Sequence, residues 1–263
     1  MELIENRGEF SGRFSRWRAN DALAGYPYVT NIHAPLTPLR RALPMLNLAL
    51  VTSAGAYIDG TDAFDTGSKD GDLSYREIPV EVEAGDLRYA AKGYDPAGVL
   101  EDRNCQIPIE RLLEYQSNHV IGQLNTAWWS ISSHIPNARR VADELTPQLS
   151  ERLNRYDVQA ALLIPATPLC HQTLGIIARG LEQAGIPTML ISVDAKLTDM
   201  VRPPRTAYYT GEFGKVAGQP NWPEHQLRIL DESIRWIETF DQPGSRKLAV
   251  ALETAVEASR GER

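Results

Sequence analysis

A turn with the sequence PATPLCH, at residues 165–171, brings a hydroxyl, a thiol and an imidazole together. Thr167 is a good helix N-cap residue, and Pro168 then occupies the first helical position, where proline is favoured. Cys170 falls in the first helical turn, where unpaired amide groups and the helix dipole lower the pKa of a thiol. The turn predicts a nucleophilic or metal-binding thiol tuned by His171; the alternative is a capped helix that starts with a small buried Cys.

A second thiol follows charged residues in the segment DRNC, residues 102–105. Asp102 and Arg103 could position a substrate that bears a carboxylate, because Arg binds carboxylates through two hydrogen bonds. The alternative, which the local sequence favours, is a cap and an ion pair that hold the loop. Cys105 could resolve an adduct formed on Cys170, act with it as an acid–base pair, or form a redox disulfide if the Cα atoms lie within about 7 Å.

The segment Thr52-Ser53-Ala54-Gly55 is predicted to form the other wall of the site. Its small residues let a ligand approach backbone amides, and Thr52 and Ser53 offer hydroxyl groups. The segment does not contain the G-x-G-x-x-G fingerprint of dinucleotide binding, so neither NAD nor a flavin is predicted. The spacing of His and Cys residues matches no known metal site. We therefore predict no cofactor and no protein-bound metal.

The elements that must position these residues alternate between strands and helices. Continuous apolar runs predict buried strands at residues 47–52, 158–164 and 187–193. A helix is predicted at 168–184, with Gly185 as its stop, which makes a βαβ unit with parallel strands. The α/β class follows. Further strands are predicted at 75–82, 87–91, 120–124 and 206–210, and helices at 108–118, 137–155 (interrupted near Pro147), 223–240 and 246–258.

Composition excludes several classes of function. The chain has 263 residues, a formal charge of −7 and a pI near 5.3, which argues against nucleic-acid binding. Its apolar runs are too short to span a membrane, and residues 1–14 contain no apolar signal core, so a cytoplasmic protein is predicted. Two Cys residues rule out a disulfide framework. Aromatic residues in the arm at 1–43 suggest a homo-oligomer.

Six blocks between about residues 30 and 240 resemble the selenoprotein B family of glycine, sarcosine and betaine reductases, which includes a D-proline reductase subunit. The blocks are HAPLTPLRRALPMLNLALVTSAGAY, GDLSYREIP, DRNCQIPIERL, LLIPATPLCHQTLGIIARGLEQAGIPTMLIS, RPPR and GQPNWPEHQLRIL. The resemblance implies a parallel-sheet sandwich of two Rossmann-like lobes around a cleft. With the mixed composition of the first 43 residues, this predicts an arm at 1–43 and an α/β unit at 44–263, with lobes at about 44–150 and 151–263. It also implies reductive cleavage of a carbon–nitrogen bond by a selenocysteine or Cys nucleophile.

The chain departs from this family at the central position. Thr167 stands where the family has selenocysteine or Cys, and Cys170 matches the second thiol of the family turn. A Thr hydroxyl is a poor nucleophile without a base and forms no selenide–sulfide bond. A polar family segment is altered to AAKGYD at 90–95, where Tyr94 is the clearest remnant and is predicted to contact the substrate. The substrate is therefore predicted to differ.

The leading prediction is a thiol-dependent oxidoreductase-like enzyme that acts on a small polar, amino-acid-like molecule. Cys170 is the nucleophile or thiol reductant, Thr167 hydrogen-bonds the thiolate or substrate, His171 shuttles a proton, and Cys105 resolves an adduct. The expected partners are the small substrate and either a partner subunit or a thiol reductant. The alternatives are a cofactor-independent isomerase or racemase that uses both Cys residues, and a non-catalytic binding subunit that has lost its nucleophile.

Overall fold

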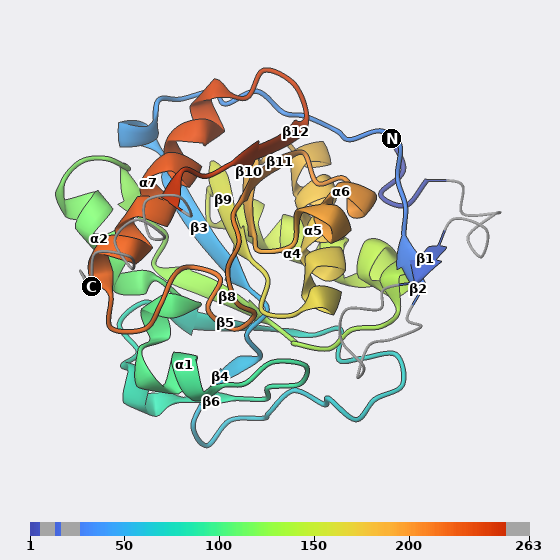
Figure 1. Ribbon diagram of the computed structural model, residues 1–263, viewed down its shortest axis with the longest axis horizontal. Coiled ribbons are helices and arrows are strands. Elements are labelled where there is room, and N and C mark those ends of the chain that lie inside the picture. Colours follow the sequence, from blue (N-terminus) through green and yellow to red (C-terminus); the bar gives the residue numbers. More distant parts are fainter. Residues whose placement is uncertain (6–13, 17–26, 251–263) are drawn as a thin grey trace.

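The computed structural model describes residues 1–5, 14–16 and 27–250 of the chain. Its central sheet contains the strands β3 (Asn47–Thr52), β5 (Tyr75–Pro79), β7 (Gln123–Leu124), β8 (Ala127–Ile131), β9 (Ala160–Ile164), β10 (Thr188–Ser192), β11 (Arg205–Tyr208) and β12 (Gly244–Lys247). The order across the sheet is β12-β11-β10-β9-β3-β8-β5, and β7 also pairs with β3 (Figure 1). All neighbours are parallel except β5, which runs antiparallel to β8. The predicted α/β class with a mostly parallel sheet is confirmed.

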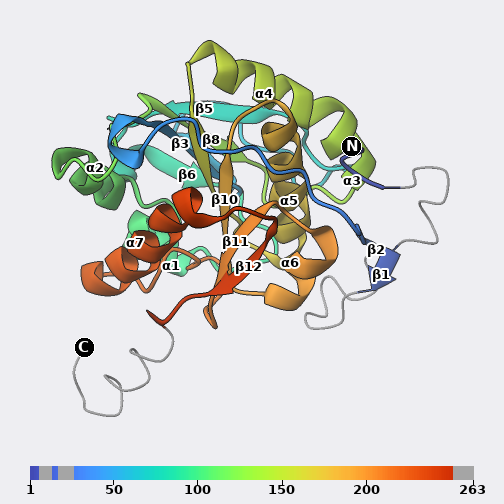
Figure 2. The same cartoon turned by 90° about the horizontal axis from the view of Figure 1, so that it is seen from above.

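Helices cover both faces of this sheet. They are α1 (Ala97–Glu101), α2 (Ile109–Ser117), α3 (Ala138–Arg140), α4 (Thr146–Arg155), α5 (Pro168–Gln183), α6 (Ala195–Val201) and α7 (Pro223–Thr239). Helices α4 and α5 lie on one face, and α2 and α7 lie on the other (Figures 1 and 2). None of the helices in the described ranges is long and apolar enough to cross a membrane.

The central strands are apolar throughout because both faces of the sheet are buried. Every residue of β3 is buried, and successive side chains enter opposite cores. Leu48 and Leu50 pack on the side of α2 and α7, whereas Ala49 and Val51 pack on the side of α4 and α5. The fully buried pair Trp128 and Trp129 in β8 divides in the same way. Both tryptophans are therefore core residues rather than the lining of an aromatic pocket.

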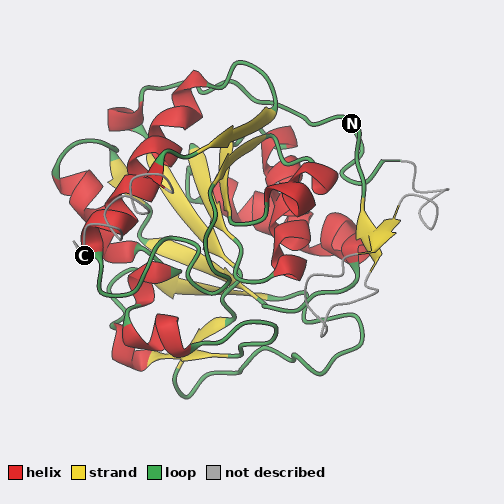
Figure 3. Cartoon of the chain, in the orientation of Figure 1, coloured by secondary structure: helices red, strands yellow, loops and turns green. Residues whose placement is uncertain are grey.

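Two smaller ladders lie beside the main sheet (Figure 3). Strands β4 (Ala56–Ile58) and β6 (Leu87–Tyr89) pair antiparallel next to the end of β3, and β1 (Phe14–Arg16) pairs with β2 (Pro27–Val29) in the arm. Short 3-10 turns occupy Leu43–Met45, Ala84–Asp86 and Arg103–Cys105.

Most of the predicted elements are found near their predicted bounds. The helix expected at 137–155 is interrupted as predicted, because a π-helical segment at Val141–Leu145 joins α3 to α4 just before Pro147. Pro147 has no amide hydrogen to donate to the preceding turn, and the Val141 carbonyl accepts from both the amide and the hydroxyl of Thr146. Strand β8 was not predicted.

The helix predicted at 246–258 is wrong at its start. Residues Arg246 and Lys247 belong to β12, where they lie opposite Ala207 and Tyr208 of β11. The strand is short, polar and at the edge of the sheet, so the sequence carries no apolar pattern for it. Residues 251–258 of the predicted helix lie outside the described part of the chain.

One buried arginine fixes the described parts of the arm to the body. Arg179 in α5 donates hydrogen bonds to the carbonyls of Glu2 (3.0 Å), Leu3 (2.8 Å), His33 (2.5 Å) and Arg202 (3.0 Å). The aromatic and basic residues at 17–26, on which the predicted homo-oligomer partly depends, lie outside the described residues.

The two predicted lobes meet within the sheet. Strand β3, from residues 44–150, pairs with β9, from residues 151–263, over the register Leu48↔Ala160 to Thr52↔Ile164. The division near residue 150, the Rossmann-like lobes and a cleft between them stay predictions.

Candidate active site around Cys170

The start of α5 has the predicted cap. The Thr167 backbone is extended, and its hydroxyl oxygen accepts a hydrogen bond from the Cys170 amide at 3.1 Å. Pro168 is the first helical residue, and Gly185 follows the helix with a φ of +87°. Both ends of α5 are therefore as predicted. The cap places the Cys170 side chain at the carboxyl edge of the parallel sheet, beside the end of β3.

The Cys170 thiol is buried among carbonyl groups. Its Sγ lies 3.3 Å from the Ser133 carbonyl and 3.7 Å from the Ser53 carbonyl, both of which accept from a protonated thiol. Burial raises the pKa of Cys170, and the nearby hydrogen bonds offset only part of that rise. The prediction that the helix start lowers this pKa is wrong for the described conformation, because complete loss of solvent outweighs the helix dipole.

His171 is also buried and neutral. Its Nδ1 lies 2.7 Å from the Thr167 carbonyl, which can only accept, so Nδ1 carries the proton and Nε2 carries the lone pair. Burial lowers the pKa of His171 to about 4. Nε2 has no hydrogen-bond partner among the described residues, and the Phe213 ring packs edge-on against the imidazole. His171 therefore supplies a proton acceptor rather than a positive charge.

The predicted second wall lies directly beside this turn, and its hydroxyls bind backbone groups. The Thr52 hydroxyl donates to the Ile164 carbonyl at 3.1 Å. The Ser53 hydroxyl accepts from the Ala166 amide at 3.1 Å, and the Ser53 carbonyl faces the Cys170 thiol. These contacts join the end of β3 to the turn before α5.

Gly55 is required where the chain leaves β3. Its φ is +68°, and its amide and carbonyl bond to Ile131 and Ala90 at 3.1 and 2.9 Å. A Cβ atom on Gly55 would lie 2.8 Å from the Ala90 carbonyl oxygen. The space beside Gly55 is therefore occupied by the backbone at Ala90. The sequence instead predicted that a ligand approaches the chain at this position.

The segment at 90–94 covers the site. The Tyr94 hydroxyl donates to the Ala54 carbonyl at 2.6 Å, next to Ser53. The Ser133 hydroxyl donates to the Ala90 carbonyl at 2.8 Å and accepts from the Lys92 amide at 2.9 Å. Burial raises the pKa of Tyr94 well above its ordinary value, so the phenol stays protonated. Tyr94, predicted as a substrate contact, therefore lies in the same cluster as Cys170.

Cys105 approaches this cluster from the other side, through Gly214. Its Sγ lies 3.6 Å from the Gly214 carbonyl, while the Gly214 amide donates to the Ala166 carbonyl at 2.9 Å. Gly214 also packs against the Tyr94 ring, because a Cβ there would lie 2.5 Å from it. Burial raises the pKa of Cys105 to about 12. Both thiols are free in this structure.

Asp102 and Arg103 form contacts within the chain. The Asp102 carboxylate accepts from the Asn104 and Asn221 amides, both at 2.9 Å, and from the Gln226 side chain at 2.7 Å. Arg103 is buried and pairs with Glu110 at 2.5 Å. This is the arrangement of a cap and an ion pair, which was the favoured alternative.

Two contributors to the site were missed. Ser133 follows β8, and the aromatic sequence of β8 did not predict a strand. The position of Ser133 at the carboxyl edge was therefore not predicted. Buried Gln106 donates to the Ile164 carbonyl at 3.2 Å and accepts from the Val216 amide at 3.1 Å, which ties the segment at 211–217 to the sheet. Its position directly after Cys105 was the available signal.

No group of three or more His, Cys, Asp or Glu side chains within the described ranges is placed to hold a metal ion. The predictions on metals and cofactors therefore stay predictions.

The chain is similar in sequence to subunits of amino-acid reductases. The chain is 28% identical to the D-proline reductase subunit gamma of Acetoanaerobium sticklandii over 208 residues, which are 79% of this chain and 85% of the relative. It is 27% identical to a glycine reductase complex component B subunit gamma of Symbiobacterium thermophilum, over 64% of this chain and 41% of the relative. It is 24% identical to a sarcosine reductase complex component B subunit beta of Peptoclostridium acidaminophilum, over 62% of this chain and 38% of the relative.

The chain spans about two fifths of the length of these glycine and sarcosine reductase relatives. No family model matches the chain, and no solved structure matches it significantly. The predicted resemblance is nevertheless confirmed: this chain is a homologue of the D-proline reductase gamma subunit and of component B subunits of glycine and sarcosine reductase complexes.

Proposed function

We propose that the chain is a subunit of a reductase complex that acts on a small amino-acid-like molecule, and that Cys170 is its redox thiol. The observation that carries the proposal is the position of the Cys170 Sγ, at a capped helix start and between the Ser53 and Ser133 carbonyls. Open α/β sheets bind ligands at this carboxyl edge. The homologues, which are named as reductase subunits, supply the reaction class.

The described conformation is the protected state of the thiol. Segments 90–94 and 211–216 close over it, and each contains a glycine with positive φ, Gly93 at +89° and Gly214 at +77°. When these segments open, water and substrate reach Cys170, and the amides of the first turn of α5 stabilise the thiolate. Thr167 then hydrogen-bonds the sulfur, and Nε2 of His171 takes up the proton.

The electron balance requires a second thiol. Cleavage of a carbon–nitrogen bond consumes two electrons and two protons, and oxidation of two thiols to one disulfide supplies both. Thr167 cannot be the second group, because a hydroxyl does not form a disulfide. Cys105 supplies it after the Gly214 segment withdraws, or a thiol of a partner subunit does.

The proposed substrate contacts are the residues in and beside the end of β3. The Ser53 carbonyl lies 3.7 Å from the Cys170 thiol, and Thr52, Gly55 and Tyr94, which hydrogen-bond to the Ile164, Ala90 and Ala54 backbone, complete the primary binding surface. Asp102 and Arg103 bind the substrate carboxylate only if they exchange the internal partners described above. Glycine, sarcosine and D-proline, the molecules in the names of the relatives, are the first substrates to test.

The test measures dithiothreitol-dependent reduction of these three molecules by the complex, purified from its native host through a tag on this chain. Cys170→Ala should abolish turnover with an unchanged Tm and unchanged co-purifying subunits. Cys170→Ser is the matched control for the side-chain volume and should be equally inactive. Full activity of Cys170→Ala would refute the thiol role.

A non-catalytic binding subunit is the second candidate, and the hydrogen-bonded, neutral state of the Cys170 thiol favours it. The two functions differ in the reactivity of the native thiol. Iodoacetamide labelling, located by mass spectrometry, should increase at Cys170 when the complex binds substrate if the thiol works. Labelling that requires denaturant in every state, together with substrate binding, indicates the binding subunit.

A further inference from the structure

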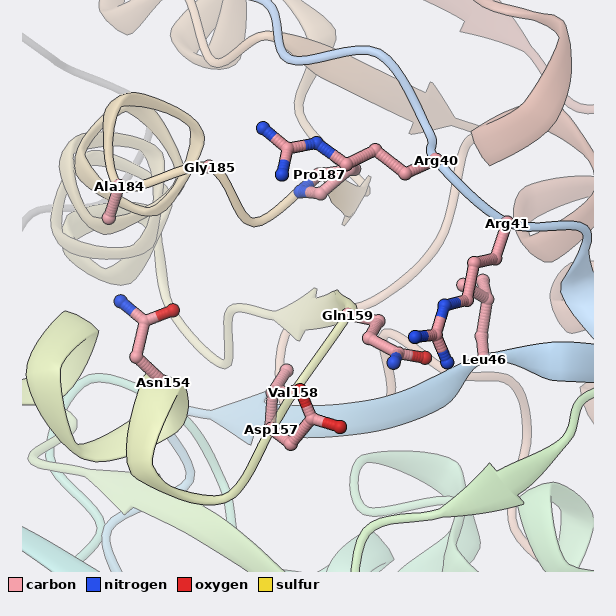
Figure 4. A pocket seen from close by; sticks show the side chains of 10 residues that line it. All are labelled: Arg40, Arg41, Leu46, Asn154, Asp157, Val158, Gln159, Ala184, Gly185 and Pro187. Atoms are coloured by element: carbon pink, nitrogen blue, oxygen red, sulfur yellow. The ribbon is translucent and has the colours of Figure 1, made fainter.

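A second pocket lies at the opposite edge of the sheet, where the parallel strands begin. Its volume is about 290 Å³, and it is bordered by the residues that precede β3, β9 and β10 and by the carboxyl end of α5. Two adjacent arginines, Arg40 and Arg41, extend into it from the arm, and Asn154, Asp157 and Gln159 lie across from them (Figure 4). The Cys170 cluster uses none of these residues.

The two guanidinium groups are not ion-paired with any described residue. Neither Arg40 nor Arg41 forms an ion pair or a side-chain hydrogen bond with any residue in the described ranges, although Asp157 lines the same pocket. Asp157 has a φ of +53° and forms no ion pair with either arginine. The lining therefore carries two positive charges against one negative charge.

The backbone that carries these arginines is fixed on both sides. Before them, the Thr37 amide donates to the Glu182 carboxylate at 2.5 Å, and Arg205 donates to the Thr37 carbonyl at 2.7 Å. After them, the Leu43 amide donates to the Glu238 carboxylate at 2.8 Å. The arginines are therefore held at this pocket rather than carried on a free arm, which lowers the entropic cost of binding a ligand.

Amide donors complete the lining. The Gln159 carbonyl oxygen accepts from the Asn47 amide at 3.1 Å, and its NH₂ group, which donates to no described residue, remains available as a donor in the lining. Each guanidinium group can bind the oxygens of a carboxylate or phosphoryl group through two parallel hydrogen bonds. We propose that this pocket binds a small oxyanion, a carboxylate or phosphoryl compound, at a site separate from the Cys170 cluster.

The test is titration calorimetry of the full chain with sodium phosphate and, separately, with sodium succinate, at constant ionic strength adjusted with chloride. Saturable binding of one of these anions is expected. In the double variant Arg40→Gln, Arg41→Gln, affinity should fall at least about tenfold, because bidentate charge-assisted hydrogen bonds are lost. Preference for phosphate assigns a phosphoryl ligand, and preference for succinate assigns a carboxylate.

Two further variants separate binding from general effects of charge. Arg88→Gln removes an exposed arginine of β6 and should leave affinity unchanged. Asp157→Asn removes the negative charge from the pocket, fits a positive φ, and should tighten anion binding. The absence of saturable binding up to about 10 mM, or equal affinity in the double variant, would overturn the proposal. The readout is binding alone, so it does not depend on whether Cys170 is catalytic.

Discussion

The two edges of the central sheet are built in opposite ways. At the carboxyl edge, the Cys170 cluster is neutral, and its hydroxyls and thiols bond to backbone groups within the chain. At the amino edge, the salt-bridged pair Glu182 and Arg205 is buried, and Arg40 and Arg41 line an open pocket. One edge is closed and uncharged, and the other is open and charged.

This difference teaches which kind of recognition each edge can perform without moving. The amino edge can attract an anion in the described conformation, because its guanidinium groups are already exposed. Under the proposed function, the carboxyl edge must first break hydrogen bonds within the chain, so its affinity for the proposed substrate is reduced by the free energy of opening. The two proposals therefore differ: long-range charge would attract the ligand at the amino edge, and a conformational change would control access at the carboxyl edge.

The largest effect should come from breaking the charge pair at the amino edge. Glu182→Gln leaves Arg205 buried without an ionised partner and weakens the bonds to Thr37 and Thr188. We expect a loss of about 3–5 kcal/mol in the free energy of unfolding, measured by urea denaturation. Glu144→Gln, which breaks an exposed pair with Arg140, is the matched control and should change stability little. Equal losses in the two variants would contradict the importance of burial.

The neutral carboxyl edge should show itself in the pH dependence of stability. The pKa of His171 in the folded chain is about 4, below its ordinary value of 6.5. The contribution of neutral His171 to the free energy of unfolding is complete above pH 6.5. It is lost as the pH falls toward 4, because in this range the unfolded chain takes up the proton more readily than the folded chain. The loss should reach about 3 kcal/mol near pH 4. Unfolding measured from pH 7 to 4 should be less pH-dependent in His171→Gln, and identical curves would argue against a buried neutral imidazole.

The smallest expected effect tests how firmly the Ala90 segment is packed against the carboxyl edge. Gly55 and Gly60 both have positive φ, but only Gly55 meets a neighbouring carbonyl oxygen. Gly60→Ala should cost about 1 kcal/mol through backbone strain alone, whereas Gly55→Ala should cost about 2–3 kcal/mol through strain and the clash with Ala90. Thermal melting curves of the two variants give the difference. Similar values would mean that the Ala90 segment moves away easily.

How much of the fold could be predicted depended on burial. The strand at 47–52 was predicted residue for residue, because two buried faces require a continuous apolar run. Strand β8 escaped prediction because AWWSI mixes aromatic and polar residues without alternation, although all five are buried. Strand β12 escaped because an edge strand of sequence GSRK depends on the pairing with β11 rather than on its own pattern.

The candidate site could be predicted as far as local geometry reaches. The Thr167 cap and the position of Cys170 follow from residues that are adjacent in sequence. The state of the thiol does not, because the carbonyls of Ser53 and Ser133 and the segment around Gly214 come from distant parts of the chain. A dipole argument at a helix start therefore misses the desolvation that tertiary packing imposes.

The Arg179 contacts have a consequence for the order of folding. The guanidinium bonds to carbonyls at residues 2, 3, 33 and 202. During synthesis on a ribosome, residues 2 and 3 leave the exit tunnel long before α5 and residue 202 exist. Residues 2, 3 and 33 therefore cannot form these hydrogen bonds until α5 has been synthesised, and the full set of contacts forms only after α6. These residues are translated before the guanidinium group that binds them, so they reach their native positions late.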